Sequence, residues 1–241
     1  MTIPKHLLFD GAIPHEAQEL AGQLAKMEPE KSGLSEWQKA RLGKITASHF
    51  GDVKYLKSGA WGETALTYLY DLIGEHLTGQ PSESFTGSKA TEWGNQYEEE
   101  ALMAYKQRTG RKTKLGHFLQ DPKNPLVGGT PDAFCGEQGV LEIKCPFNFK
   151  NHLRTVITKK VPDDYKSQVL GHLMLSGREW CDFVSYDPRI KSQHRLVIVR
   201  VKAKEVQAEL DELAQRIIDF HKLLLKQLEV LKIKSIHPIK F

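Results

Sequence analysis

Two short stretches decide how this chain folds: GTPDAF at residues 129–134 and LEIKCP at residues 141–146. Residues 140–144 have the composition of a short β-strand, and side chains two positions apart on a strand point to the same face. Glu142 and Lys144 therefore point together. The sequence predicts that this strand presents a carboxylate and an ammonium on one face of a sheet.

A hairpin is expected just before this strand. Residues 134–135 form its first arm, and the GEQG sequence at residues 136–139 forms its turn. This geometry brings Asp132 back to the place where Glu142 and Lys144 lie. Ile143 faces the opposite way, into the core, while its carbonyl oxygen stays near the edge of the sheet.

Two carboxylates beside an ammonium suit the hydrolysis of a phosphodiester, which needs a hard cation to neutralise charge and to acidify a bound water. Carboxylate oxygens favour Mg²⁺ or Mn²⁺, and the three scattered cysteines lack the spacing of a zinc site. We expect the cation and partial burial to lower the pKa of Lys144, so that it orients or deprotonates the water. The alternative is a surface hairpin in which Glu142 and Lys144 form an ordinary ion pair.

The order P-D, a gap, then E-x-K resembles the PD-(D/E)xK nuclease superfamily. Further motifs follow one another along about two thirds of the chain: Trp37 with RLGKITAS at residues 41–48, WGNQYE at residues 93–98, Tyr165 with Gln168, and YDPR at residues 186–189. In this order they resemble the lambda-type exonucleases, also called the YqaJ-like viral recombinase family.

This resemblance implies an α/β fold with a mixed central β-sheet flanked by helices, built on the restriction-endonuclease-like core of the superfamily. It also implies two Mg²⁺ ions, replaceable by Mn²⁺. Their ligands would be Glu98, Asp132, Glu142 and the backbone carbonyl of Ile143. The amide of Gln168 would bond Lys144 or the attacking water, which makes Asp132, Glu142, Lys144 and Gln168 the expected catalytic residues.

The family holds the 5′-phosphate of the degraded strand in a pocket beyond the metals. The matching positions here are Arg41, Ser48, Thr130 and Lys150. Arginine can form two hydrogen bonds with a phosphate, and hydroxyls donate without adding charge. Thr130 replaces a serine and Lys150 replaces an arginine of the best-known members, so the preference for a 5′-phosphate is expected to be weaker.

The activity implied by the resemblance is a Mg²⁺-dependent 5′ to 3′ exonuclease that acts on double-stranded DNA ends and leaves 3′ single strands for phage-type recombination. A homotrimeric ring and a single-strand annealing recombinase as partner belong to the same expectation. Two alternatives remain open. One is a non-catalytic scaffold that binds DNA ends, and the other is an endonuclease of the same superfamily.

The composition agrees with one globular α/β domain: 241 residues, a net charge of +4 and three cysteines. No signal segment or membrane-spanning run is visible, and the scattered cysteines fit a reducing cytoplasm, here that of a bacterium hosting a phage or prophage. We expect an accessory extension at residues 1–33, the nuclease domain at residues 34–231 and a tail at residues 232–241.

Periodicity and capping signals predict the remaining elements. Two helices, capped by Ser35 and Thr46, are expected between Ser35 and about Tyr55. Further helices are expected at residues 63–77, 89–108, 147–158, 163–175 and 203–231, strands at 114–120, 180–186 and 195–201, and a loop at 81–87. The last two strands are expected at the buried centre of the sheet. The helix at 203–231 either packs on its own domain or contacts a partner. The histidines, His172 among them, are expected to carry no chemistry.

Overall fold

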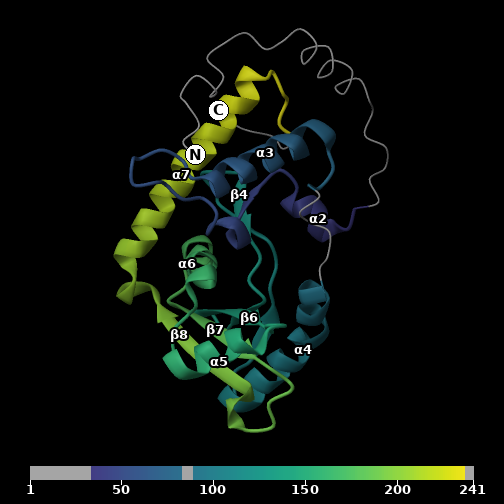
Figure 1. Ribbon diagram of the computed structural model, residues 1–241, viewed down its shortest axis with the longest axis vertical. Helices are drawn as coiled ribbons and strands as arrows, with labels where there is room; N and C mark the ends of the chain where they lie inside the picture. The colour runs from purple at the N-terminus through teal and green to yellow at the C-terminus, as the bar shows by residue number, and fades with distance from the viewer. Residues whose placement is uncertain (1–33, 83–88, 237–241) are drawn as a thin grey trace.

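The computed structural model describes residues 34–82 and 89–236 (Figure 1). The expected N-terminal extension, most of the expected loop before residue 89 and the last five residues of the tail lie outside these ranges. The helices are α2 (Glu36–Arg41), α3 (Glu63–Thr78), α4 (Lys89–Thr109), α5 (Phe149–Thr158), α6 (Asp163–Ser176) and α7 (Gln207–Val230). The strands are β1 (Ile45–Thr46), β2 (Thr113–Leu115), β3 (Leu119–Gln120), β4 (Val127–Gly129), β5 (Ala133–Cys135), β6 (Gly139–Lys144), β7 (Trp180–Tyr186) and β8 (Leu196–Lys202). No helix in these ranges is long and apolar enough to span a membrane.

The larger sheet is mixed and has the strand order β2-β5-β6-β7-β8. Strands β5 and β6 form the predicted antiparallel hairpin, in which Ala133 pairs with Leu141 and Cys135 with Gly139. Strand β7 runs parallel to β6, so the chain must cross over between them, and it does so through α5 and α6. The predicted mixed sheet flanked by helices is confirmed.

Alternating side chains divide this sheet between two hydrophobic clusters. Leu141, Ile143 and Val184 face α4 and pack against its Leu102 and Tyr105. The opposite face belongs to the second cluster, which includes Val140, Cys181, Phe183 and the α6 residues Val169 and Leu173. The period of two along β6 therefore places Ile143 in one core and Glu142 on the face that α6 covers.

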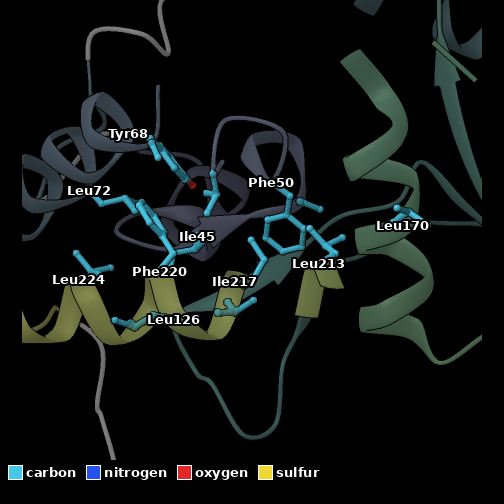
Figure 2. Close-up of a cluster of buried hydrophobic side chains, with 14 of the residues drawn as sticks. Ile45, Phe50, Tyr68, Leu72, Leu126, Leu170, Leu213, Ile217, Phe220 and Leu224 are labelled. Atoms are coloured by element: carbon cyan, nitrogen blue, oxygen red, sulfur yellow. The ribbon is translucent and has the colours of Figure 1, made fainter. Parts of the chain in front are cut away.

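The second cluster continues into the upper part of the molecule, where the small sheet β1-β4-β3 lies among α3, α6 and α7. Figure 2 shows Leu213, Ile217, Phe220 and Leu224 projecting from α7 toward Tyr68 and Leu72 of α3 and toward the segment that carries Ile45 and Phe50. The apolar face of α7 thus packs on its own domain, the first of the two alternatives.

Two sequence predictions are wrong near the small sheet. Ser35 caps α2 as expected, but Thr46 starts no second helix. It lies in β1, pairs with Gly128 and precedes a 3₁₀ turn at Ala47–His49. The expected strand at 114–120 is split between the two sheets at Gly116, whose position leaves a Cβ only 1.5 Å from the carbonyl oxygen of Pro131.

The prediction for the last two strands is half right. Strand β7 is buried along its whole length, from Trp180 to Tyr186. Strand β8 forms an edge of the sheet, and only Leu196 and Val197 are buried. The valine- and isoleucine-rich sequence of β8 therefore does not indicate a buried central strand. As an edge strand, β8 pairs with β7 on one side only, and most of its side chains keep some exposure.

Candidate active site

Asp132 lies directly before β5 and is fixed against β6 by backbone and side-chain hydrogen bonds. Its backbone N–H donates to the Leu141 carbonyl at 3.0 Å, and its own carbonyl accepts from Gly116 N at 3.0 Å. The carboxylate Oδ2 accepts a short hydrogen bond from the backbone N–H of Ile143. The hairpin thus brings Asp132 beside β6, as the sequence predicted.

Glu142 is buried on the face of β6 that α6 covers, with 1% of its side chain exposed. Its Oε1 lies 2.6 Å from Lys144 Nζ, and its Oε2 lies 2.8 Å from His172 Nε2. Burial alone would raise the pKa of this carboxyl, but the Lys144 charge and the hydrogen bond from His172 lower it to about 2. Glu142 is therefore ionised at neutral pH.

Lys144 leaves the same face of β6 and lies above the ring of Tyr165 from α6, with Nζ 5.2 Å from the ring centroid. Burial acts to lower the Lys144 pKa, but the charges of Glu142 and Asp132 outweigh it and raise that pKa. The predicted lowering of the Lys144 pKa depends on a bound cation as well as on burial, and without the cation burial alone does not produce it. Lys144 is an ammonium in the metal-free chain, because two carboxylates attract its proton.

The third predicted carboxylate, Glu98, belongs to α4 and faces the same region. It lines a cleft of about 480 Å³ together with Ile143, Lys144 and Tyr165, and a neighbouring cleft of about 630 Å³ together with Asp132. Burial and the nearby charge of Glu142 raise the pKa values of both Glu98 and Asp132. The three carboxylates together form a local excess of negative charge, and this charge contributes to the raised pKa values of Glu98 and Asp132.

This donor set fits a hard divalent cation. Oxygen ligands suit Mg²⁺ and Mn²⁺, and the buried Oε1 of Glu142 has only the Lys144 ion pair and no hydrogen bond of normal geometry. Among the described residues, however, no group of three His, Cys, Asp or Glu side chains is arranged to hold a metal ion. The ammonium of Lys144 pairs with Glu142 Oε1 in this arrangement.

A second polar cluster forms around Arg41 at the end of α2. Its Nη2 donates to Ser48 Oγ at 2.8 Å and to Thr46 Oγ1 at 3.3 Å. The guanidinium also lies 4.6 Å from the ring centroid of Trp37, whose side chain is half exposed. Burial lowers the Arg41 pKa. The structure therefore brings together two of the residues that the sequence assigned to a phosphate pocket.

Thr130 and Lys150, the other two residues of the predicted phosphate pocket, lie in different segments of the chain. Thr130 directly follows Gly129, which packs so closely on Ala47 that an added Cβ would lie 2.6 Å from the Ala47 Cβ, and Ala47 stands between Thr46 and Ser48. The Thr130 hydroxyl is buried and makes no hydrogen bond within the described structure. Lys150 is exposed in the first turn of α5, next to Asn148, which lines the Lys144 cleft.

Sequence reasoning missed one residue of the site and placed another differently. His172, expected to carry no chemistry, bonds Glu142, whereas Gln168 is half-buried and Lys144 pairs with Glu142 rather than with its amide. Tyr165, Gln168 and His172 stand three and four positions apart, so they share one face of α6. That helical spacing was the available signal for His172.

Comparison with known proteins identifies relatives over most of the chain. The YqaJ-like viral recombinase domain matches residues 36–179. The alkaline exonuclease LHK-Exo of Laribacter hongkongensis is 32% identical, with a TM-score of 0.74 over 82% of this chain and 95% of that one. LHK-Exo in complex with dAMP is 30% identical, with a TM-score of 0.69 over 80% of this chain and 96% of that one.

A phage-related exonuclease from Haemophilus somnus shares the fold at 18% identity, with a TM-score of 0.57 over 77% of this chain and 96% of that one. No curated protein matches the chain. The family match spans more than half of the 241 residues and includes Arg41, Glu98, Asp132, Glu142, Lys144 and His172. The chain therefore belongs to the YqaJ-like viral recombinase family.

Proposed function

We propose that this chain is a divalent-metal-dependent exonuclease that degrades one strand of duplex DNA from its 5′ end and leaves a 3′ single strand for annealing. The observation that carries the proposal is the juxtaposition of Asp132, Glu142 and Lys144 on one hairpin, with Glu98 facing them from α4. The similarity to an alkaline exonuclease over most of the chain supports the same reading.

The carboxylates of Glu98, Asp132 and Glu142, with the carbonyl of Ile143, would hold two Mg²⁺ ions, or Mn²⁺ in their place. When bound, such ions neutralise phosphate charge and make a bound water more acidic. Asp132 is already oriented by the Ile143 N–H, so part of this donor set is fixed before any ion binds. Preorganised ligands of this kind reduce the cost of assembling the site.

Lys144 is the residue that acts on the water or on the phosphate. Its ammonium stands at the mouth of the cleft, with about a quarter of its side chain exposed, above the face of Tyr165. As a charged donor it can orient a water or stabilise charge that develops on a phosphate oxygen. Neutralising Glu142 and Asp132 would remove the charges that now raise its pKa, which would make proton transfer easier.

The Arg41 cluster is proposed to bind the 5′-phosphate of the strand being degraded. A guanidinium flanked by the hydroxyls of Thr46 and Ser48, with the unbonded hydroxyl of Thr130 nearby, offers several donors to one phosphate. Lys150, in the first turn of α5 and two residues after the cleft residue Asn148, would add a point charge. Binding the end of a strand at a fixed site favours cleavage from that end.

Linear duplex DNA labelled separately at its 5′ and 3′ ends tests the activity. Incubation with Mg²⁺ should release the 5′ label early, chelator should stop the reaction, and a covalently closed circle should stay intact. Cutting of the circle would indicate an endonuclease. No cleavage under any condition, with DNA ends still bound, would indicate a non-catalytic scaffold.

The homotrimeric ring and the annealing partner are part of this proposal. Sedimentation equilibrium of the purified chain should give three times the mass of 27.3 kDa. A monomer would refute the ring and leave the chemistry untouched. Binding of the purified chain to a single-strand annealing recombinase is the matching test for the partner.

A further inference from the structure

His172 differs from the other buried polar residues because it contacts the carboxylate of Glu142 and does not line either cleft. It lies on α6, and its Nε2 is 2.8 Å from Glu142 Oε2. Both side chains are 1% exposed. His172 cannot contact a substrate from this position, so any effect on the reaction must pass through Glu142.

The His172 imidazole lies in a largely apolar environment. Its Nδ1 is buried and has no hydrogen-bond partner among the residues that the structure describes. Its helix neighbours Val169 and Leu173 belong to the hydrophobic core. An apolar side chain would suit this environment better than an imidazole with one unsatisfied nitrogen, because buried polar atoms without partners destabilise a fold. The bond to Glu142 is the compensating interaction.

We infer that His172 is a positioning residue, which fixes Glu142 through Oε2 so that this carboxylate keeps its orientation when Lys144 leaves it. This inference rests on the proposed function. Glu142 has two cationic or donating neighbours, Lys144 on Oε1 and His172 on Oε2. Lys144 cannot both act on a water and remain the anchor of Glu142. His172 supplies a second anchor from a different element, one that the reaction does not use.

The division between the two anchors also agrees with their exposure. Lys144 has 27% of its side chain exposed and lines the cleft, whereas His172 is enclosed by α6 and the sheet. Hydrogen bonds that orient a metal-binding side chain commonly change metal affinity or activity by about 10- to 100-fold when they are removed. His172 is therefore expected to affect how tightly the carboxylates bind a cation.

Two substitutions separate positioning from packing. His172→Leu introduces an apolar side chain of similar size and removes the hydrogen bond, whereas His172→Gln keeps an N–H donor close to the position of Nε2. We expect His172→Leu to weaken Mn²⁺ binding, measured by calorimetry without DNA, by about 10- to 100-fold. His172→Gln should bind Mn²⁺ within about threefold of wild type. If His172→Leu does not fold, His172→Asn replaces it, because its amide is too short to reach Oε2.

The matched control is His152→Leu. His152 is also fully buried, but it bonds Ser185 Oγ and the His194 carbonyl instead of a carboxylate. This variant should lower the melting temperature and leave Mn²⁺ affinity unchanged. Equal Mn²⁺ affinity in wild type and His172→Leu would overturn the inference, and so would equal losses in the Leu and Gln variants.

The calorimetry distinguishes this inference from the proposed function. Failure of the end-label assay with wild-type protein would refute the exonuclease, whatever the His172 variants do. Success of that assay, with Mn²⁺ affinity independent of His172, would keep the exonuclease and refute the positioning role alone. A rise in the Mg²⁺ concentration needed for half-maximal cleavage by His172→Leu, with recovery in His172→Gln, would support both.

Discussion

The two polar clusters of this molecule are built in opposite ways. In the carboxylate cluster, Glu142 is buried and already neutralised by Lys144, a cation of its own strand. In the Arg41 cluster, a partly exposed guanidinium donates to the neutral hydroxyls of Thr46 and Ser48. The carboxylate cluster therefore has excess negative charge in a poorly hydrated site. The Arg41 cluster has one positive charge surrounded by neutral hydroxyl groups.

This difference predicts which substitutions change activity and stability most. Electrostatic interactions are stronger where water is excluded, so groups in the carboxylate cluster shift one another's pKa values strongly. Contacts near the surface are screened and contribute little each. We therefore expect large, non-additive effects at the carboxylates and Lys144, and smaller effects that can be separated at Arg41 and Ser48.

The largest effect is expected from Lys144→Ala. Removing the ammonium should reduce cleavage by about 10²- to 10⁴-fold, the range typical of a group that orients or transfers a proton. Binding of DNA ends, measured in chelator by fluorescence anisotropy, should stay close to wild type. Lys123→Ala, at an exposed position outside the clefts, is the control and should cleave normally. Normal cleavage by Lys144→Ala would exclude this role for the residue.

The next effect concerns stability and has opposite signs at the two carboxylates of the hairpin. Because the folded-state pKa of Asp132 is raised, its ionisation costs stability as pH rises through that pKa. Asp132→Asn should therefore melt a few degrees above wild type at pH 7–9 in chelator, although it cleaves no DNA. The two proteins should converge near pH 3, below the unfolded value of 3.8, where Asp132 is protonated in the folded state and largely so in the unfolded one.

Glu142→Gln should do the reverse. The Glu142 pKa is lowered to about 2, so its charge stabilises the fold above the unfolded value near 4.5, and this stability is lost as pH falls toward 2. The neutral amide of this variant would leave Lys144 and His172 without their anion, at a cost on the order of 2–4 kcal/mol at neutral pH. Thermal melts of both variants across pH 2–9 measure the pair. Shifts of the same sign would contradict the distinction between the two carboxylates.

A moderate effect is expected from Arg41→Ala. The ratio of cleavage rates on 5′-phosphorylated and 5′-hydroxyl ends should fall by roughly 10- to 100-fold, because a hydrogen bond to a charged group contributes about 1.5–3 kcal/mol. Lys39→Ala is the control on the same helix, since Lys39 pairs with Glu36 on the surface. An unchanged ratio in Arg41→Ala would mean that the phosphate binds elsewhere.

The smallest effect is expected from Ser48→Ala. This substitution removes one neutral hydroxyl that accepts from Arg41 at 2.8 Å. A single hydrogen bond of this kind contributes about 0.5–1.5 kcal/mol, so the 5′-phosphate preference should fall by roughly two- to fivefold. The same end-label assay, run beside Arg41→Ala, gives the comparison. A loss larger than that of Arg41→Ala would show that Ser48, not Arg41, is the principal phosphate contact.

Local pattern was sufficient to predict the centre of the site. The β5–β6 hairpin is specified by a short run of alternating and turn-forming sequence, so the approach of Asp132 to β6 could be derived without tertiary information. The bounds of β7 were predicted because an apolar run between turn signals is a strong local indication. Glu98 and the Arg41 cluster came from the resemblance to a family.

Tertiary contacts decided what the sequence could not. Thr46 has the side chain of a helix cap, but its segment pairs with β4, where it lies opposite Gly128. At Gly128 an added Cβ would collide with the ring of Phe118. The raised pKa of Lys144 depends on two carboxylates brought together by folding, against a burial effect of opposite sign. The His172 bond depends on the docking of α6 onto β6. Helical spacing shows which face of α6 carries His172, but not which strand that face meets.

Helix α6 takes part in both halves of the molecule (Figure 1). One face of this helix places His172 and Tyr165 beside β6. Another face packs Gly171 so closely on Phe50 that an added Cβ would lie 2.6 Å from the ring. A substitution on α6 can therefore disturb the acidic strand, the packing on Phe50, or both. A shift of this helix would move the two polar clusters relative to each other, so the position of α6 couples their geometry.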